Sequence, residues 1–345
     1  MRKVWIGAAV VAAIFVVLVG TLTVVGLNTR SVRVAKCAND DPAACTALIE
    51  SGRESPENLA IEYYDRGTIY DRPGHYDQAI ADLTQAIALK PDYALAYGNR
   101  GNAYAGMRSY DQAVADATKA IALKPDYATA YATRGAAYGR KGLYDQAIAD
   151  YTQAIALQPD YAVSYYNRGL NYGRKGLYDA AIADYTQAIR HDPAYILAYL
   201  GRGDSYRRQE LYDLAIADYN KVIEIKPDNV RAYYDRGNAY GKKRLYDQAI
   251  ADYSMAIGLK PDLGQAYNNR GWTYHLQGED AKGLPDAEKG VALEPNEPNH
   301  FGTRAAIYEK LGERDKAIAD YRAALALDAR FQPAEDGLRR LDAAR

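Results

Sequence analysis

The chain has 345 residues, of which 48% are hydrophobic and 25% charged, and these ordinary globular values exclude wholesale disorder. Its 43 basic residues nearly balance 44 acidic ones, so there is no global positive field of the kind that recruits nucleic acid or acidic membrane surfaces. The 33 tyrosines stand against only 3 phenylalanines, an excess that the fold has to accommodate.

The first expected element is an apolar helix at residues 4–27, which carry no charge. As a helix this segment would be about 36 Å long, enough to cross the hydrocarbon core of a bilayer. Arg2 and Lys3 precede it, as in an export signal, and favour a cytoplasmic N-terminus, whereas three basic residues within 30–36 favour the opposite orientation. We expect a retained single-pass anchor, with a cleaved signal peptide as the alternative.

Residues 28–59 are expected to form a linker that contains both cysteines, Cys37 and Cys45, and a partial helical repeat at 41–49. A disulfide between the two cysteines would suit an oxidising compartment; two unpaired, packed thiols are the alternative. A metal site is not expected, because no histidine lies near them in sequence. We therefore expect the rest of the chain on the periplasmic side of a bacterial membrane, or secreted to the periplasm if the signal is cleaved.

Residues 60–331 repeat with a period of 34. Seven prolines from Pro91 to Pro295 mark this period, because each lies 34 residues from the next. A frame that starts at Ala60 contains eight units without insertion or deletion. The units are 60–93, 94–127, 128–161, 162–195, 196–229, 230–263, 264–297 and 298–331.

Each unit has the pattern of two short helices. Large residues at positions 4 and 11 and small ones at positions 8, 20 and 27 define one face of each helix. Glycine at position 15 in five units would end the first helix in left-handed backbone. Aspartate at position 18 in seven units would cap or charge the start of the second helix, and proline at position 32 would end it. The sequence therefore predicts an all-α stack of helix–turn–helix units.

The period and the pattern Tyr-x-x-x-Gly-x-x-Tyr, followed by Ala, Tyr, Ala and Pro, resemble the tetratricopeptide repeat (TPR). The resemblance implies a right-handed superhelix that binds peptides or proteins in its concave groove. Since an end unit has no neighbour to cover its apolar side, we expect caps: the partial repeat ahead of the array and an amphipathic helix at 332–345 behind it.

Two charged positions are the same in all eight units: position 7 is Arg, from Arg66 to Arg304, and position 23 is Asp, from Asp82 to Asp320. A ladder of arginines could bind a ligand. A feature this uniform suits scaffolding better, so we favour an Arg–Asp bracket that ties the two helices of each unit together.

The peptide groove is expected where the units differ. In the family, positions 2, 5, 9, 12 and 13 of the first helix face the concave side. The candidates at these positions are Tyr64, Asn102, Arg140, Tyr166, Arg174, Asp204, Arg208, Tyr234, Asn238, Asn268 and Trp272. Rings, amides and cations of this kind could hold an extended acidic peptide. Alternatively, the cations only offset the negative end of each first helix. The tyrosines outside position 5 are expected to be packing residues.

Two departures from the pattern bear on these expectations. Chaperone-binding members of the family hold an acidic C-terminus with Lys at position 5 and Asn at position 9, and Lys occurs at position 5 nowhere in this chain, so that activity is not expected. The second helix of unit seven contains Gly283, Pro285 and Gly290, which are poor helix formers. A flexible joint and simple sequence drift both remain open as interpretations.

The sequence contains no phosphate-binding glycine loop, nucleophile elbow or paired-histidine motif, so we expect neither an enzyme nor a small-molecule cofactor. We expect a membrane-tethered scaffold that binds a peptide or protein segment in its groove. The alternative is an adaptor that docks a membrane enzyme or secretion complex through its convex surface.

Overall fold

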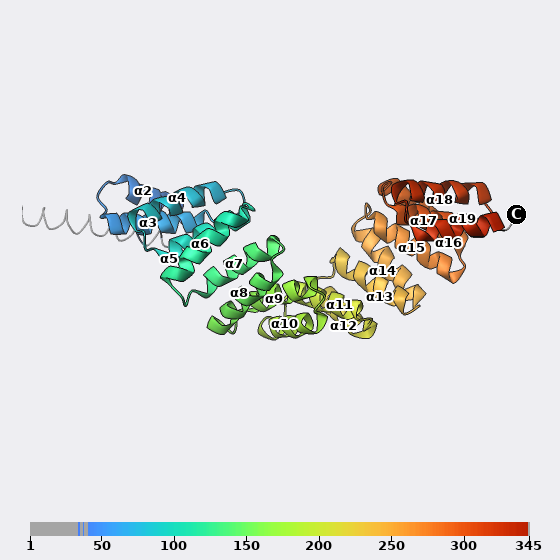
Figure 1. The fold of residues 1–345 in the computed structure, drawn as a ribbon, viewed down its shortest axis with the longest axis horizontal. Helices are drawn as coiled ribbons and strands as arrows, with labels where there is room; N and C mark the ends of the chain where they lie inside the picture. The colour runs from blue at the N-terminus through green and yellow to red at the C-terminus, as the bar shows by residue number, and fades with distance from the viewer. Residues whose placement is uncertain (1–33, 35–36, 38–40, 344–345) are drawn as a thin grey trace, which may run out of the picture. The chain divides into compact units, whose positions relative to one another are not determined.

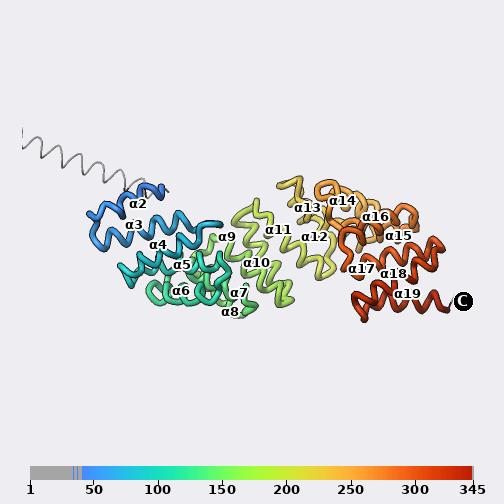
Figure 2. The backbone as a smooth tube through the Cα atoms, turned by 90° about the horizontal axis from the view of Figure 1, so that it is seen from above, coloured from blue at the N-terminus to red at the C-terminus, as the bar shows by residue number. Residues whose placement is uncertain are grey.

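The computed structural model describes Val34, Cys37 and residues 41–343. These residues form eighteen helices and no strand. The chain divides into two compact units, Met1–Asn171 and Tyr172–Arg345 (Figures 1 and 2). The predicted membrane segment at 4–27 lies outside the described residues. Among those that are described, no helix combines the length and the apolar character that a membrane crossing needs.

The first unit consists of consecutive helices, and from α2 to α8 each helix packs against the next along the chain. The first helices of repeats two and three, α5 and α7, also contact each other. Helix α9 (Ala162–Arg174) spans the boundary between the units. The other helices are α2 (Pro42–Glu50), α3 (Pro56–Ile69), α4 (Tyr76–Leu89), α5 (Ala94–Gly106), α6 (Tyr110–Leu123), α7 (Ala128–Arg140) and α8 (Tyr144–Leu157).

The second unit continues the same order. Its first helices also contact one another, α11 with α13, α13 with α15 and α15 with α17, so they form one layer and the second helices form the other. The helices are α10 (Tyr178–His191), α11 (Ile196–Arg208), α12 (Tyr212–Ile225), α13 (Val230–Lys242), α14 (Tyr246–Leu259), α15 (Gly264–Gln277), α16 (Asp280–Leu293), α17 (Pro298–Lys310), α18 (Arg314–Leu327) and α19 (Gln332–Ala343).

The turn between the two helices of each repeat has left-handed backbone at position 15. The five glycines predicted there have φ between 75° and 89°. The other three repeats have Arg108, Glu210 and Arg244 at this position, with φ of 60–62°. The turn geometry is therefore fixed by the packing of the two helices, and a side chain is tolerated there at the cost of backbone strain.

The second helices begin without a side-chain cap. The aspartates at position 18, such as Asp111 and Asp145, lie inside the first turn, and no side-chain hydrogen bond caps α6 or α8. Of the two predicted roles, the structure therefore supports only the electrostatic one, in which a carboxylate favours the positive end of the helix.

Helix α2 takes the place of a second helix ahead of the first repeat. It packs against α3, and Asp41 caps its start by accepting from the amides of Ala43 and Ala44. Cys37 and Cys45 form a disulfide and are buried with Leu48 in one small apolar cluster. The disulfide therefore lies against the capping helix of the array.

Helix α19 covers the other end of the array, where Ala334 and Leu341 are buried against α18. A Cβ at Gly337 would lie 2.3 Å from Cζ of Tyr321, so the glycine permits this close approach. Arg340 adds two hydrogen bonds to Glu309 of α17.

Helix α16 of repeat seven is continuous from Asp280 to Leu293 although Pro285 lies inside it. A Cβ on Gly283 would lie 2.7 Å from the carbonyl oxygen of Gly271, so α15 and α16 approach each other through a pair of glycines. Gly283 therefore has a packing role in this repeat, which neither of the two sequence interpretations contained.

Candidate functional site

The arginine at position 7 and the aspartate at position 23 form the expected bracket between the two helices of a repeat. In each pair Nε and Nη2 of the arginine donate to the two carboxylate oxygens, at distances of 2.6–2.9 Å. The aspartates are buried and the arginines partly buried. The pairs are Arg66–Asp82, Arg100–Asp116, Arg134–Asp150, Arg202–Asp218, Arg236–Asp252, Arg270–Asp286 and Arg304–Asp320.

The same arginines also join neighbouring repeats. Nη1 of Arg100 donates to Thr84 Oγ1 of the preceding repeat at 3.0 Å, and Arg270 donates to Ser254 in the same way at 2.8 Å. Each guanidinium also lies over the ring of the aromatic residue at position 4. In repeat two, Cζ of Arg100 is 5.6 Å from the ring centroid of Tyr97. The donors of these arginines are therefore used within the array, which supports the bracket over a ligand-binding ladder.

On the face formed by the first helices, the repeats differ in the residues at positions 5 and 34, which lie next to each other in space. In repeat one both are tyrosines, and the rings of Tyr64 and Tyr93 pack at a centroid distance of 4.9 Å. In repeat two the ring of Tyr127 lies directly on Gly98, where a Cβ would be 2.5 Å from Cε1 of the tyrosine. Burial raises the pKa of Tyr127 to about 12. One or two rings therefore fill this space in repeats one and two.

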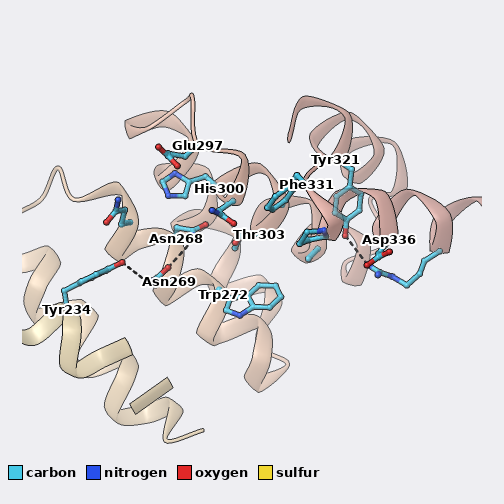
Figure 3. Close-up of a pocket in the computed structure, with 16 residues that line it drawn as sticks. Tyr234, Asn268, Asn269, Trp272, Glu297, His300, Thr303, Tyr321, Phe331 and Asp336 are labelled. Carbon is cyan, nitrogen blue, oxygen red and sulfur yellow. Dashed lines mark hydrogen bonds between the residues drawn. The ribbon is translucent and has the colours of Figure 1, made fainter. Parts of the chain in front are cut away.

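Repeat seven has Asn268 and Glu297 at the same two positions, and a cavity of about 680 Å³ opens there. Figure 3 shows the ring of Tyr234 on one side of the two amides Asn268 and Asn269, and Phe331 on the other. The cavity lies entirely within the second unit. Its lining residues come from α13, α15, α17, α18 and α19 and the segments that join them, and include Gln265, Trp272, Asn299, His300, Thr303, Asp336 and Arg340.

The amides of this cavity form a short hydrogen-bonded chain. Asn269 Nδ2 donates to Tyr234 Oη at 3.1 Å and to Asn238 Oδ1 at 2.9 Å, and Asn268 Nδ2 donates to Asn269 Oδ1 at 3.3 Å (Figure 3). Asn268 is only 7% exposed, and its Oδ1 has no hydrogen-bond partner. A buried acceptor without a partner costs free energy, which a hydrogen-bond donor on a ligand could recover after a rotation of the side chain.

His300 is buried at the back of the same cavity. Its Nδ1 lies 3.1 Å from the carbonyl oxygen of Gly290, so Nδ1 is the donor of that contact, and Nε2 lies 3.7 Å from a carboxylate oxygen of Glu294. Gly290 therefore brings its backbone close enough to orient the imidazole.

A second cavity of about 310 Å³ shares Asn269 and Trp272 with the first. Its other walls are Arg207, Tyr212, Asn238, Gly241, Lys242, Tyr253, Thr273 and Leu276. Tyr253 is nearly fully buried and donates from Oη to Asn238 Oδ1 at 2.9 Å. The two cavities together make a continuous row of polar and aromatic residues along α13 and α15, which we call the second-unit groove.

A charged cluster lies beside this groove in repeats five and six. Asp204 accepts from Tyr219 Oη at 2.9 Å and pairs with Arg231, which also donates to Asp235 at 3.2 Å. Burial, followed by the charge of Asp204, raises the pKa of the Asp235 carboxyl to about 6, although Arg231 and Arg207 lower it. This carboxyl therefore titrates closer to neutral pH than an ordinary aspartate.

The structure brings some of the predicted groove residues together. Tyr234, Asn268 and Trp272 line the larger cavity, Asn238 and Trp272 line the smaller one, and Asp204 belongs to the charged cluster. In the first unit, Tyr64 accepts from Asn99 and packs on Tyr93, while the exposed Asn102 donates to Asp71. Arg140, Arg174 and Arg208 are exposed at the ends of their helices, and Tyr166 is half-buried in α9.

Several residues of the groove are not among the predicted ones. Asn269 and Thr303 occupy position 6, next to position 5 on the first helix, and both line the larger cavity. Phe331 and Glu297 occupy position 34, which lies after the second helix and is distant from position 5 in sequence. The sequence contains a signal for Phe331 and Glu297, because position 34 is Tyr in repeats one to four and a different residue in each later repeat.

Cys37, Glu62 and Asp65 place three potential metal-ligand atoms close together. The sulfur of Cys37 is bonded to Cys45, so it cannot act as a thiolate ligand.

Models of the tetratricopeptide repeat family match the chain. Those described as TPR repeat match residues 62–107, 140–176 and 203–243. Those described as tetratricopeptide repeat match 94–127, 162–195, 230–263 and 302–331. Together they cover more than half of the chain, so the protein belongs to the tetratricopeptide repeat family, and the prediction of an all-α TPR fold is confirmed.

Solved structures show the same fold. The C-terminal part of a TPR protein from Cytophaga hutchinsonii is 23% identical, with a TM-score of 0.58 over 70% of this chain and 99% of that one. A TPR protein from Parabacteroides merdae is 20% identical, with a TM-score of 0.57 over 72% and 98%. The Cut9–Hcn1 hetero-tetramer of APC/C gives 17% identity and a TM-score of 0.56 over 82% of this chain, but only 55% of that chain. A search of the curated proteins finds no match.

Proposed function

We propose that this protein is an interaction scaffold that binds an extended peptide segment of a partner in the second-unit groove. The observation that carries the proposal is the cavity at repeat seven, where Asn268 and Glu297 replace the rings that fill the equivalent space in repeats one and two. Family membership supports the same role, because TPR arrays act as scaffolds for protein interactions.

An extended peptide suits the chemistry of this groove. Its backbone alternates N–H donors and C=O acceptors, and carboxamide side chains such as Asn268 and Asn269 offer both groups at once. Trp272 is 40% exposed although it is a large aromatic residue, and buried aromatic anchors dominate binding energy at protein interfaces. A peptide side chain that covers Trp272 would therefore remove apolar area from water while its backbone pairs with the amides.

We infer that the groove binds its ligand and does not transform it, and membership of a family of interaction scaffolds supports this inference.

We further propose that residues 4–27 hold the array at a membrane, with the repeats on the periplasmic side. The apolar run supports a membrane anchor, and the disulfide of Cys37 with Cys45 supports an oxidising compartment. Release into the periplasm after cleavage of the segment is the alternative. A reporter fused to the C-terminus tests the location, and activity of a reporter that works only in the cytoplasm would overturn it.

The binding proposal is tested by selecting a random-peptide display library on the whole chain in detergent and titrating the enriched peptides while recording tryptophan fluorescence. Trp5 lies in the apolar segment and Trp272 in the groove, so a Trp5→Phe background reports on the groove alone. We expect enriched peptides to lose affinity by about tenfold or more with Asn269→Ala, because the substitution removes the amide that positions Tyr234 and Asn238 in the groove wall.

The control is Met255→Ala, which truncates a 48% exposed side chain on α14 that belongs to neither cavity. Selection of no peptide, or equal affinity for the Asn269 and Met255 variants, would refute binding in the groove. A partner that still crosslinks in cells when Asn269→Ala and Glu297→Tyr are combined would instead favour docking through the convex surface.

A further inference from the structure

The smaller cavity of the second-unit groove combines two cations with exposed apolar surface, whereas the one arginine that lines the larger cavity, Arg340, is paired with Glu309. Arg207 at position 12 of repeat five and Lys242 at position 13 of repeat six line it from one side. Trp272 and Leu276, four residues apart on α15, line it from the other side and are 40% and 45% exposed. Gly241 leaves the wall between them without a side chain.

The charges around this cavity do not cancel. Arg231 pairs with both Asp204 and Asp235. Arg207 shares Asp204, at 3.7 Å, and also interacts with Tyr219 and, over a longer range, with Asp235. Nε of Arg207 is shielded from solvent and has no hydrogen-bond partner. In the part of the chain that the structure describes, no carboxylate pairs with Lys242. Three cations therefore face two carboxylates, and the surplus positive charge lies at the cavity wall.

The neighbouring Lys243, in contrast, already has a carboxylate partner within the array. It is one residue further along the chain, pairs with Asp213 of the preceding repeat and does not line the smaller cavity. Lys141 makes the equivalent pair with Asp111 three repeats earlier, in the first unit. Lys242 has no such role in the array.

We propose that the smaller cavity is a subsite for an acidic side chain, aspartate or glutamate, that is next to an apolar residue of a bound peptide. The carboxylate would lie between the Arg207 guanidinium and the Lys242 ammonium, and the apolar neighbour would cover Trp272 and Leu276. This inference rests on the proposed function, because it assigns the sequence preference of the same groove. A charge-assisted contact to the partly buried Arg207, with the charge of Lys242 at the same cavity, recognises a carboxylate more strongly than a neutral amide of the same shape.

The test uses the peptides selected on the whole chain. We expect an acidic residue beside an aromatic or aliphatic one to recur among them. For one such peptide, changing the acidic residue to its amide should raise Kd about tenfold, and Lys242→Gln in the protein should have a similar effect. Lys243→Gln is the matched control, since it removes the same charge from the adjacent residue and should change Kd less than about twofold.

Further measurements distinguish a direct contact with the carboxylate from a general electrostatic attraction. In the Lys242→Gln protein, amidation of the peptide's acidic side chain should cost little more, because the two changes remove the same interaction. Arg207→Lys should retain more affinity than Arg207→Gln. An Asp204→Asn variant should bind more tightly, because it removes the carboxylate that competes for Arg207.

The outcomes are distinct. If peptides are enriched without an acidic preference, or if Lys242→Gln and Lys243→Gln weaken binding equally, the acidic subsite is wrong while groove binding stands. If only a free C-terminal carboxylate is needed, so that amidating the peptide's end and not its side chain abolishes binding, the side-chain subsite is overturned. If no peptide is enriched, both proposals fail.

Discussion

The two units are built on the same framework and differ on the face that their first helices form. In the first unit Tyr93 and Tyr127 occupy position 34 and fill the space beside position 5. In the second unit the equivalent position is Glu297 in repeat seven, and a cavity of about 680 Å³ remains. Repetition therefore fixes the packing of the helices, and the larger cavity opens at repeat seven, where positions 5 and 34 both lack a ring.

Position 2 of the repeat shows a parallel difference in polarity. In the first unit it includes Ile61 and Val163, which are 45% and 37% exposed. In repeats six to eight it is Arg231, Gln265 and Asn299, two of which line the larger cavity. Position 2 is therefore apolar in most repeats up to Leu197 of repeat five, and polar in repeats six to eight, which line the second-unit groove.

The largest effects should come from the framework and should be equal in both units. Asp116→Ala in the first unit and Asp252→Ala in the second each leave a partly buried guanidinium without its carboxylate, which costs about 3 kcal/mol. Urea unfolding combined with hydrogen exchange of each unit measures this. The exposed Asp111→Ala and Asp213→Ala are controls, expected within about 1 kcal/mol of the wild type. A large loss in one unit alone would mean that the frameworks differ.

The filled and the open face can be exchanged by substitution at position 34. Tyr127→Ala removes the ring over Gly98 and should destabilise the first unit by about 2 kcal/mol, since the ring is only partly buried. Glu297→Tyr should fill the larger cavity and abolish peptide binding while the free energy of unfolding stays within about 1 kcal/mol. Denaturant unfolding and peptide titration measure the two effects.

Tyr161→Ala is the control for the ring removal, because Tyr161 holds the same position in repeat three but is 44% exposed. Its loss should cost less than about 1 kcal/mol. Unaltered peptide affinity in the Glu297→Tyr variant would show that the larger cavity is not where the ligand binds.

The charged cluster of the second unit should make its stability depend on pH. The pKa of Asp235 is raised to about 6 in the folded state, above its unfolded value, so the folded state holds this proton more tightly. The penalty for the ionised carboxylate is therefore present above pH 6 and disappears as the pH falls toward 4. Asp235→Asn should stabilise the second unit by about 1–2 kcal/mol at pH 8, after allowing for a weakened contact with Arg231, and by nothing near pH 4.

Unfolding of the wild type and the Asp235→Asn variant across this pH range measures the difference directly. Asp204→Asn provides a comparison, because Asp204 is the carboxylate that raises the pKa of Asp235 and its removal should lower that pKa. A stabilisation by Asp235→Asn that is the same at pH 4 and pH 8 would exclude a raised pKa as its cause.

The framework could be predicted from the sequence and the cavity could not, for a physical reason. Arg66 and its seven equivalents recur at one interval, so periodicity alone places them in the bracket. The cavity depends on the joint size of Asn268 and Glu297, which are far apart in the repeat and come together only after the helices pack. Trp272, Asn238 and Tyr234 could be found because single positions of the repeat predict the face that they occupy.

The smallest expected effect concerns the turn that both units share. Arg108 in the first unit and Arg244 in the second have left-handed backbone with φ of 62° and 60°, at the position where five other repeats have a glycine with positive φ at no steric cost. Arg108→Gly and Arg244→Gly should each stabilise the protein by about 0.5–1 kcal/mol, because relief of the strain exceeds the greater entropy of glycine in the unfolded chain. Urea unfolding measures the change, with Gly142→Ala as the reverse substitution, expected to destabilise by about 1 kcal/mol. Arg108 and Arg244 occupy the same position of the repeat, so equal gains would show that this turn, which sets the spacing of the helices, is alike in both units. The difference between the units would then lie in the groove.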